Sequence, residues 1–221
     1  AYALNKLGQY KKSIKCCNEA IKIDKKWKLP WNNKGLALDN LATNDAGVMQ
    51  NGRYKKAIKC YDEAIKIDKK WKLPWFNKGI VLDRLGQFLE SIKCTDEAIK
   101  LDKKFVHAWN SKGVTLDKMR LHQEAIKCYN EAAKLDKKWI IPPYNIGIAL
   151  DNLGQHNKAK KYFRKALIGH SKGWYELYIQ GSASLKLGQY KKAIKCFDEV
   201  LNINPDHADA WIGKGWCLNK L

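Results

Sequence analysis

A glycine that returns at a fixed interval constrains the fold of this chain more than any other feature. Its spacing is 44 residues once and then 34 residues four times, as read from Gly35, Gly79, Gly113, Gly147, Gly181 and Gly215. A repeat of this length is typical of a stack of supersecondary units, each of which buries its apolar face against its neighbours. We therefore expect a quasi-one-dimensional array rather than a closed globule.

Each repeat predicts two helices. Apolar residues recur at three- and four-residue steps over 54–67, and a second run of the same kind covers 75–85, where Gly86 ends it as a helix C-cap would. We call the helix equivalent to 75–85 helix A and the helix equivalent to 54–67 helix B. Small residues, Gly79 in helix A and Ala57 or Ser91 in helix B, predict that the two axes approach closely.

The 34-residue helix-turn-helix period, with its recurring Trp-x-x-x-Gly and Gly-x-Tyr-x-x-Ala pieces, resembles the tetratricopeptide repeat (TPR) family over almost the whole chain. The resemblance implies an all-α fold, a right-handed superhelical solenoid of stacked antiparallel helix pairs that forms a single domain over 1–221. In phase, the expected units are a partial unit 1–27, the units 28–71, 72–105, 106–139, 140–173 and 174–207, and a half unit 208–221. Because both ends fall inside units, we expect a fragment of a longer protein.

Three places depart from the repeat. Unit 28–71 carries ten extra residues, 42–51, which we expect to form an exposed loop, either a neutral insertion or a partner contact. In unit 140–173, Pro143 stands where Trp75 and Trp109 stand elsewhere, and 168–171 replaces the usual Ile-Asp-Lys-Lys turn. In the half unit 208–221, apolar residues are predicted to face outwards, which leaves end-to-end self-association open.

The chain is strongly basic, with 42 Lys and Arg against 22 Asp and Glu and a net charge of +20. Such a charge suits a nucleic acid, but it is almost entirely lysine, which is the poorer residue for bidentate phosphate contacts. The lysines recur in phase on the polar side of helix B, and several have a glutamate three residues earlier, as in Glu63 with Lys66, Glu97 with Lys100 and Glu131 with Lys134. A solvated convex lysine face is the favoured interpretation, and an anionic partner is the alternative.

Five of the seven cysteines, Cys16, Cys60, Cys94, Cys128 and Cys196, share one place in the repeat. Stacked copies stand too far apart for disulfides, so we expect partly buried thiols that act as small hydrophobes in a reducing, cytoplasmic compartment. The histidines are scattered, and we expect no metal and no cofactor. No catalytic motif and no apolar run long enough to cross a membrane occurs in the sequence, so neither an enzyme nor a membrane protein is predicted.

The TPR resemblance implies that helix A residues line a concave groove for extended peptides or partner helices. The groove places are the residue after the tryptophan position and those four and seven residues further on. They hold Asn32, Leu36, Asp39, Phe76, Ile80, Asp83, Asn110, Val114, Asp117, Tyr144, Ile148, Asp151 and Tyr178. This set lacks the Lys and Asn or Arg combination that holds a C-terminal carboxylate in one subfamily, and suits a polar or basic amphipathic segment instead.

Four groove places form a ladder of aspartates near the ends of helices, where the helix dipole disfavours negative charge. The ladder is either a polar rail for a bound segment or an inherited residue paired with a neighbouring lysine. Our leading hypothesis for function is a protein-interaction scaffold that binds in the groove. The alternatives are binding of an anionic partner such as nucleic acid by the lysine face, or a spacer or regulatory segment of a larger protein.

Overall fold

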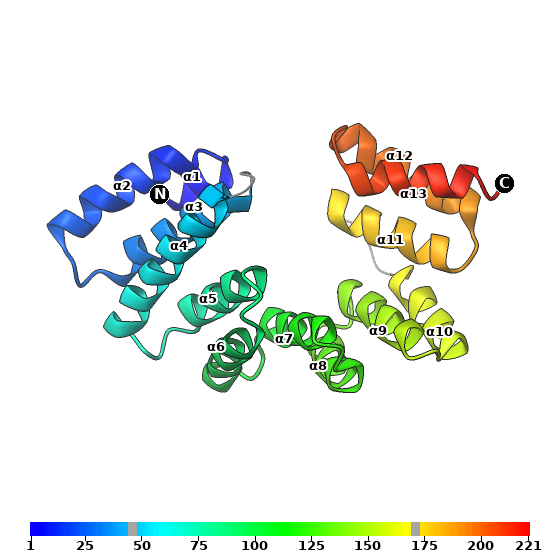
Figure 1. Ribbon diagram of the computed structural model, residues 1–221, viewed down its shortest axis with the longest axis horizontal. Helices are drawn as coiled ribbons and strands as arrows, with labels where there is room; N and C mark the ends of the chain where they lie inside the picture. Colours follow the sequence, from blue (N-terminus) through cyan, green and yellow to red (C-terminus); the bar gives the residue numbers. More distant parts are fainter. Residues whose placement is uncertain (44–47, 169–172) are drawn as a thin grey trace. The chain divides into compact units, whose positions relative to one another are not determined.

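A computed structural model describes residues 1–43, 48–168 and 173–221, and within these ranges every regular element is an α-helix (Figure 1). The helices are α1 (Tyr2–Lys6), α2 (Tyr10–Ile23), α3 (Lys28–Thr43), α4 (Val48–Ile67), α5 (Lys72–Arg84), α6 (Phe88–Leu101), α7 (Val106–Lys118), α8 (His122–Leu135), α9 (Ile141–Asn152), α10 (His156–Ala166), α11 (Trp174–Lys186), α12 (Tyr190–Ile203) and α13 (Ala208–Leu218). The prediction of an all-α fold is confirmed.

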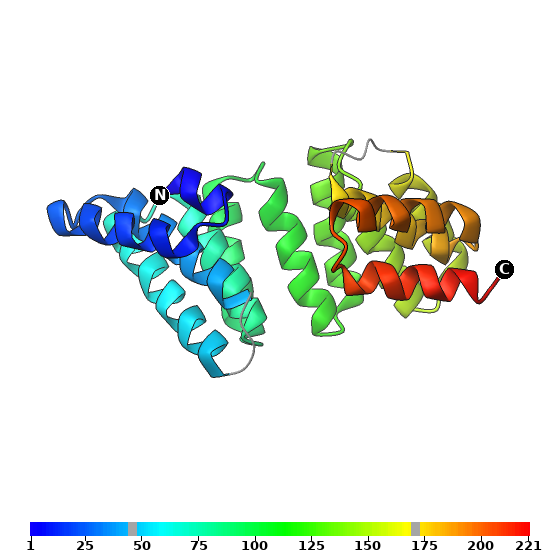
Figure 2. The same ribbon diagram turned by 90° about the horizontal axis from the view of Figure 1, so that it is seen from above.

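The helices form two compact units, residues 1–115 and 116–221, which we describe separately. In the first, α3 packs against α4 and α5 against α6; in the second, α9 packs against α10 and α11 against α12 (Figures 1 and 2). These are the A and B helices of the repeats. B helices also pack against the next A helix, as α4 does against α5, α8 against α9 and α12 against α13, so these pairs stack within their units.

The recurring glycine of helix A sets the distance to helix B. A Cβ atom at Gly35 would lie 2.5 Å from the fully buried ring of Tyr61, and one at Gly147 would lie 2.5 Å from the ring of Phe163. At Gly79 the partner is smaller, and the Ser91 hydroxyl donates a 2.8 Å hydrogen bond to the Gly79 carbonyl. The predicted close approach at small residues is confirmed.

Lysines at the start of helix A connect consecutive turns in the first unit. Lys28 forms a 2.5 Å ion pair with Asp68 of the following turn, and its ammonium lies 5.3 Å from the centre of the Trp71 ring. Lys72 repeats the arrangement with Asp102 and Phe105. The lysine hydrogen bond is the first cause that lowers the pKa of each aspartate, and a backbone N–H within the turn adds to it. The Asp-Lys-Lys-aromatic turn therefore supplies both a carboxylate and a ring to the preceding helix A.

Four tryptophans fasten helix A to the turn that precedes it. In each case the indole N–H donates to the carbonyl six residues earlier, at 2.8–3.2 Å, in the pairs Trp31 with Lys25, Trp75 with Lys69, Trp109 with Lys103 and Trp211 with Pro205. At the equivalent place in α9, Pro143 lies in the first helical turn, where proline is well tolerated. Proline has no side-chain donor, so this repeat lacks the indole bond.

The prediction of an exposed loop over 42–51 is wrong for the described part of that segment. Helix α3 continues to Thr43, α4 already begins at Val48, and Ala42 is fully buried. The insertion lengthens both helices of the pair, and Ala42 joins the core that contains Tyr54 and Ala57. Residues 44–47 lie outside the described ranges, as do 169–171 of the altered turn in unit 140–173.

The burial of the cysteines fits the expectation that they act as small hydrophobes. Cys17, Cys60, Cys94, Cys128 and Cys217 are buried, whereas Cys16 is exposed. Burial raises the pKa of Cys60 and of Cys94 to about 11, so both remain protonated thiols at neutral pH. All seven cysteines lie in the described ranges, and no disulfide joins them.

One residue adopts a backbone conformation that suits glycine. Helices α5, α9 and α11 end with a glycine at φ of 73–74°, and after α7 the same place is held by Arg120 at φ 62°. The N–H of Arg120 bonds to the Asp117 carbonyl and that of Leu121 to the Leu116 carbonyl, the pattern of a Schellman cap. Gly86 and Gln87 form the same two bonds after α5.

We predict that Arg120→Gly raises the free energy of unfolding by about 1 kcal/mol, because a side chain in the left-handed region is strained. Urea denaturation followed by circular dichroism measures the change. Gly86→Ala is the matched control and should lower stability by a similar amount, since no atom would crowd the added Cβ and only the backbone is strained. A loss of stability in Arg120→Gly would contradict this account of the turn.

Candidate protein-binding surface

The predicted groove residues of the first unit lie on α3, α5 and the start of α7. Their second places, Leu36, Ile80 and Val114, are half-buried, so each aliphatic side chain presents part of its surface to solvent. Spacing along the three A helices places these residues at equivalent positions, and α3 contacts α5 directly. The row therefore leaves part of its aliphatic surface exposed to solvent.

Two of the polar groove places in α3 are occupied by side chains of α5. The Asn77 amide donates to the Asn32 side-chain oxygen at 3.1 Å, and Arg84 forms an ion pair with Asp39. Asn32 and Asp39 are each only 6% exposed. They hold helix A of one repeat to helix A of the next, and little of either is left for a ligand to touch.

Burial is the dominant influence on the Asp39 carboxyl. It raises the pKa of Asp39, although the charge and the hydrogen bond of Arg84 act in the opposite direction. The pair is therefore a compensated buried charge, in which removal of one partner is costly.

The next groove places in this unit are also engaged by the protein itself. Phe76 packs on Phe105 with ring centres 4.9 Å apart, above a small core formed with Ala98, Ile99 and Ala108. The Thr115 hydroxyl donates to Asp83 at 3.0 Å. Asp83 and Asn110 both remain half-buried, so parts of these side chains stay accessible.

In the second unit, the aspartates of the ladder meet basic side chains. Asp117 lies 2.5 Å from Nδ1 of His122, and Asp151 lies 2.6 Å from Nδ1 of His156 and 3.0 Å from the Lys186 ammonium. Burial acts to raise the pKa of Asp151, but the hydrogen bonds from His156 and Lys186 outweigh it and the pKa is lowered.

The contacts of the aspartate ladder bear on its two interpretations, a polar rail for a bound segment and an inherited residue paired with a cation. Asp39 and Asp151 pair with a cation from the following A helix, which is the arrangement expected of an inherited structural residue. These pairs also offset the unfavourable helix dipole at the end of helix A. Asp39 and Asp151 therefore connect consecutive A helices, and a partner would compete for them with groups already in place.

The aromatic groove places of the second unit are tightly packed. Burial is the main cause that raises the pKa of Tyr144 to about 12, against a hydrogen bond with Ser182 that lowers it. Tyr178 lies between the rings of Phe197 and His207, at 6.1 and 5.0 Å. Tyr144, Ile148 and Tyr178 are all half-buried. Ile148 holds the second groove place of its repeat and is aliphatic, like the residues at that place in the first unit.

Sequence reasoning missed an aromatic extension of this surface. Trp174 and Tyr175 are 40% and 43% exposed, and Trp174 lies 5.1 Å from His207, which also contacts Tyr178. The sequence did contain a sign of this extension, because Trp174 and Tyr175 replace the Lys-Leu pair that begins helix A in units 28–71 and 72–105.

The glutamate–lysine pairs predicted on the lysine-rich surface of helix B are confirmed. Lys66, Lys100 and Lys134 each form an ion pair with the glutamate three residues earlier. The lysines at 55, 56, 59, 191, 192 and 195 are exposed. Exposed pairs of this kind contribute little to stability, because solvent screens the two charges.

The described residues contain no group of three or more His, Cys, Asp or Glu side chains arranged to hold a metal ion. In the same residues, no helix is both long and apolar enough to cross a membrane.

The stacked helix pairs define a helical-repeat scaffold, and comparison with known proteins gives its family. Tetratricopeptide repeat family models match residues 1–26, 49–70, 74–105, 106–138, 144–167 and 174–207. The chain belongs to the tetratricopeptide repeat family. A comparison with curated proteins gives no significant match.

Solved structures of tetratricopeptide repeat proteins share the fold. A protein from Parabacteroides merdae is 12% identical, with a TM-score of 0.74 over 97% of this chain and 80% of its own. MamA is 21% identical, with a TM-score of 0.63 over 75% of this chain and 91% of its own. YrrB, described as having an unusual peptide-binding site, is 20% identical, with a TM-score of 0.55 over 90% of this chain and 97% of its own.

We predict that Arg84→Met lowers the free energy of unfolding by about 2 kcal/mol at pH 7, because Asp39 is left as an uncompensated buried charge. The folded pKa of Asp39 already lies above its ordinary value, so its ionisation opposes folding as pH rises through that range. The free energy of unfolding that Arg84→Met loses should therefore be smaller near pH 4 than at pH 7. Thermal and urea denaturation at the two pH values measure it.

The double variant Asp39→Asn, Arg84→Met provides the control for this pair. It should recover most of the stability that Arg84→Met loses, because no buried charge remains. A double variant as unstable as the single one at pH 7 would show that Arg84 acts through packing of its stem instead.

Proposed function

We propose that this chain is a protein-interaction scaffold that binds an extended peptide or a partner helix along its A helices. The observation that carries the proposal is the half-buried aliphatic row, Leu36, Ile80 and Val114 in the first unit, continued in type by Ile148 in the second. The membership of the TPR family supports it, and so does the peptide-binding site named for YrrB.

The links between A helices favour a preformed binding surface. The Asn77 to Asn32 and Arg84 to Asp39 contacts join α5 to α3 on the side of the aliphatic row. Groups held in place before binding spare the scaffold an ordering cost, so the peptide bears most of the entropy loss. Preorganisation of this kind is a property of efficient peptide receptors.

The chemistry of the surface favours a polar or basic amphipathic segment. In the first unit, Asp83 of α5 is a half-buried carboxylate on the same helix as Ile80 of the aliphatic row. Apolar side chains of the segment would cover that row, while its amides or cations would bind the aspartates. The buried thiols of Cys60 and Cys94 fit a reducing compartment, and we place the protein in the cytoplasm on that ground.

A lysate pull-down tests the proposal, with nuclease-treated and untreated samples and the groove variant Ile80→Ala, Asp83→Ala, Asp117→Ala. We expect a protein that the natural chain retains after nuclease treatment, with retention reduced at least about tenfold in the variant. The matched control Lys55→Ala, Lys59→Ala, Lys191→Ala changes three exposed lysines of helix B and should retain the same protein. Circular dichroism checks that each variant is folded.

The opposite pattern would favour the lysine surface. Retention that disappears with nuclease or with the lysine variant, and survives in the groove variant, would identify an anionic partner. It would also fall steeply as salt is raised, because phosphate contacts release counterions.

A further inference from the structure

A cavity in the second unit lies where one repeat has lost its tryptophan. The sequence Ile141-Pro142-Pro143 of α9 corresponds to Leu73-Pro74-Trp75 of α5, and Pro74 and Pro142 are both fully buried. The turns before the two helices share one hydrogen bond, from the N–H of Trp71 or Trp139 to the carbonyl of Asp68 or Asp136, although α9 begins one residue later in the repeat than α5 does. At the third position of this sequence, α5 carries an indole fastened to the Lys69 carbonyl, and α9 carries the Pro143 ring.

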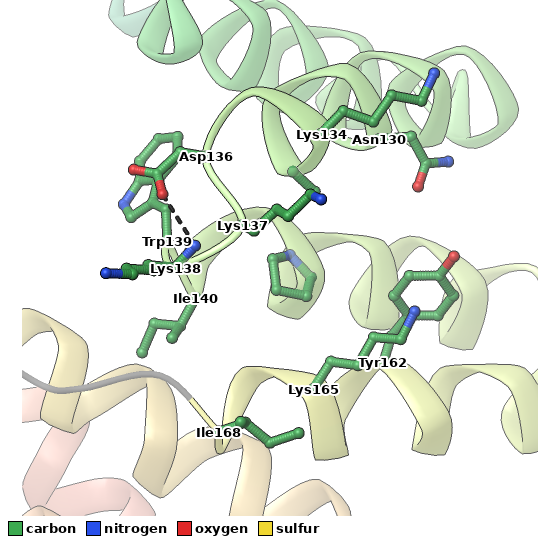
Figure 3. A pocket seen from close by; sticks show the side chains of 12 residues that line it. Asn130, Lys134, Asp136, Lys137, Lys138, Trp139, Ile140, Tyr162, Lys165 and Ile168 are labelled. Atoms are coloured by element: carbon green, nitrogen blue, oxygen red, sulfur yellow. Dashed lines mark hydrogen bonds between the residues drawn. The ribbon is translucent and has the colours of Figure 1, made fainter.

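The cavity has a volume of about 580 Å³, within the range of about 300–1,000 Å³ that small-molecule pockets occupy. Its walls come from the end of α8, the turn before α9, the first turn of α9 and the end of α10. Figure 3 shows Lys137 of the turn on one side and Tyr162, Lys165 and Ile168 on the other. Lys137 corresponds to Lys69, whose carbonyl accepts the indole N–H in α5. The cavity thus adjoins the position that an indole fills in other repeats.

The walls combine apolar groups with a strong positive charge. Pro143, Trp139, Ile140 and Tyr162 provide apolar and aromatic surface. The described lining residues include four lysines, at 134, 137, 138 and 165, against a single aspartate, Asp136. Oδ1 of that aspartate accepts the backbone N–H of Lys138 at 2.9 Å.

Charge has changed in this repeat together with shape. Lys165 stands where the other units have Glu63, Glu97, Glu131 and Glu199. Its ammonium lies 4.6 Å from the centre of the Tyr162 ring, at the mouth of the cavity. The cavity therefore has a cation where its counterparts in other repeats have a carboxylate.

An ion pair found at other joints is also replaced here. In three of the four repeats that carry the tryptophan, the lysine three residues after it binds an aspartate of the preceding B helix, in the pairs Lys78 with Asp62, Lys112 with Asp96 and Lys214 with Asp198, at 2.6–2.7 Å. At the joint of α8 and α9 these places hold Ile146, which is fully buried, and Asn130, which lines the cavity. Three changes thus separate the contact of α8 with α9 from the contacts of α4 with α5, α6 with α7 and α12 with α13, which keep the tryptophan, the glutamate and the ion pair.

A cavity in the first unit provides a contrast. It measures about 780 Å³, but Trp31 forms one of its walls, and Asp62 and Glu63 stand among its lysines. Glu63 pairs with Lys66 and Asp62 with Lys78, so these carboxylates already neutralise part of the local charge. An acidic ligand would be disfavoured there and favoured at the cavity beside Pro143.

We propose that the cavity beside Pro143 binds an aromatic side chain, best tryptophan, from an acidic segment of a partner protein. The indole would take the place that Trp75 and its counterparts take within their own repeats and would donate its N–H to the turn. Carboxylates next to it in the segment would bind Lys137, Lys138 and Lys165. None of the groove residues lines this cavity, so the experiments below test it independently of the proposed groove.

The test measures binding of fluorescein-labelled peptides to the full chain by anisotropy. The probe is Glu-Asp-Gly-Trp-Gly-Asp-Glu with blocked ends, and its control has alanine in place of tryptophan. We expect the tryptophan peptide to bind at least about tenfold more tightly than its control, and indole-3-acetate, which joins an indole to a carboxylate, to displace it.

Pro143→Trp is the decisive variant, because it gives this repeat the residue that four others already carry. It should fold, as circular dichroism would verify, and should weaken binding of the tryptophan peptide at least about tenfold by filling the cavity. Pro143→Ala leaves the cavity open and should bind the peptide as the natural chain does. Unchanged binding by Pro143→Trp would overturn the proposal.

Lys165→Glu tests the charge by restoring the residue found in the other repeats. It should weaken binding of the tryptophan peptide roughly fivefold. Lys160→Glu makes the same change of charge at an exposed residue of α10 outside the cavity lining and should weaken binding much less. Equal effects of the two variants would overturn the role of Lys165. Failure of the tryptophan peptide to bind at millimolar concentration would overturn the proposal, as would a single-stranded oligonucleotide that binds equally well to Pro143→Trp and displaces the peptide.

Discussion

The contact between a glycine of helix A and a large side chain of helix B fixes the spacing within a repeat. The Tyr61 ring lies so close to Gly35 that a single added carbon would overlap it, and Phe163 does the same at Gly147. At this spacing the alanines of helix B, such as Ala57 and Ala125, are fully buried, as close packing of the two helices requires. The next pair then packs on a surface whose shape has already been set.

Beyond the pair, polar side chains carry the repeat-to-repeat contacts of the first unit. Asn77 and Arg84 bind α3 from α5 at the groove side, and Lys28 and Lys72 bind consecutive turns. The strongly basic composition therefore has two uses. Many lysines are solvated on helix B, while a few at fixed places are structural and meet a carboxylate of the adjacent repeat.

The period and the helix pattern were readable from the sequence because both follow from local spacing. The helices, the close approach at Gly79 and the glutamate–lysine pairs of helix B were predicted on that basis. The helical structure of the insertion was not predicted. Inserted residues extend a helix only where they find a surface to pack against, as Ala42 does in the core with Tyr54 and Ala57. The bonding of Asp39 was also out of reach in detail, since its partner Arg84 lies 45 residues away. From the sequence, only the departure from the repeat at Pro143 could be seen and not the cavity itself, because the cavity walls come from three helices and a turn.

The lengthened pair of α3 and α4 has a consequence for how the array folds. With 16 and 20 residues these helices exceed the others of the described chain, and their core joins Leu38, Ala42, Tyr54 and Tyr61. In a quasi-one-dimensional stack, order begins where a unit is most stable by itself and spreads to its neighbours. The extra residues thus favour α3 and α4 as the nucleus of the first unit, from which helix formation would propagate towards α2 and α5.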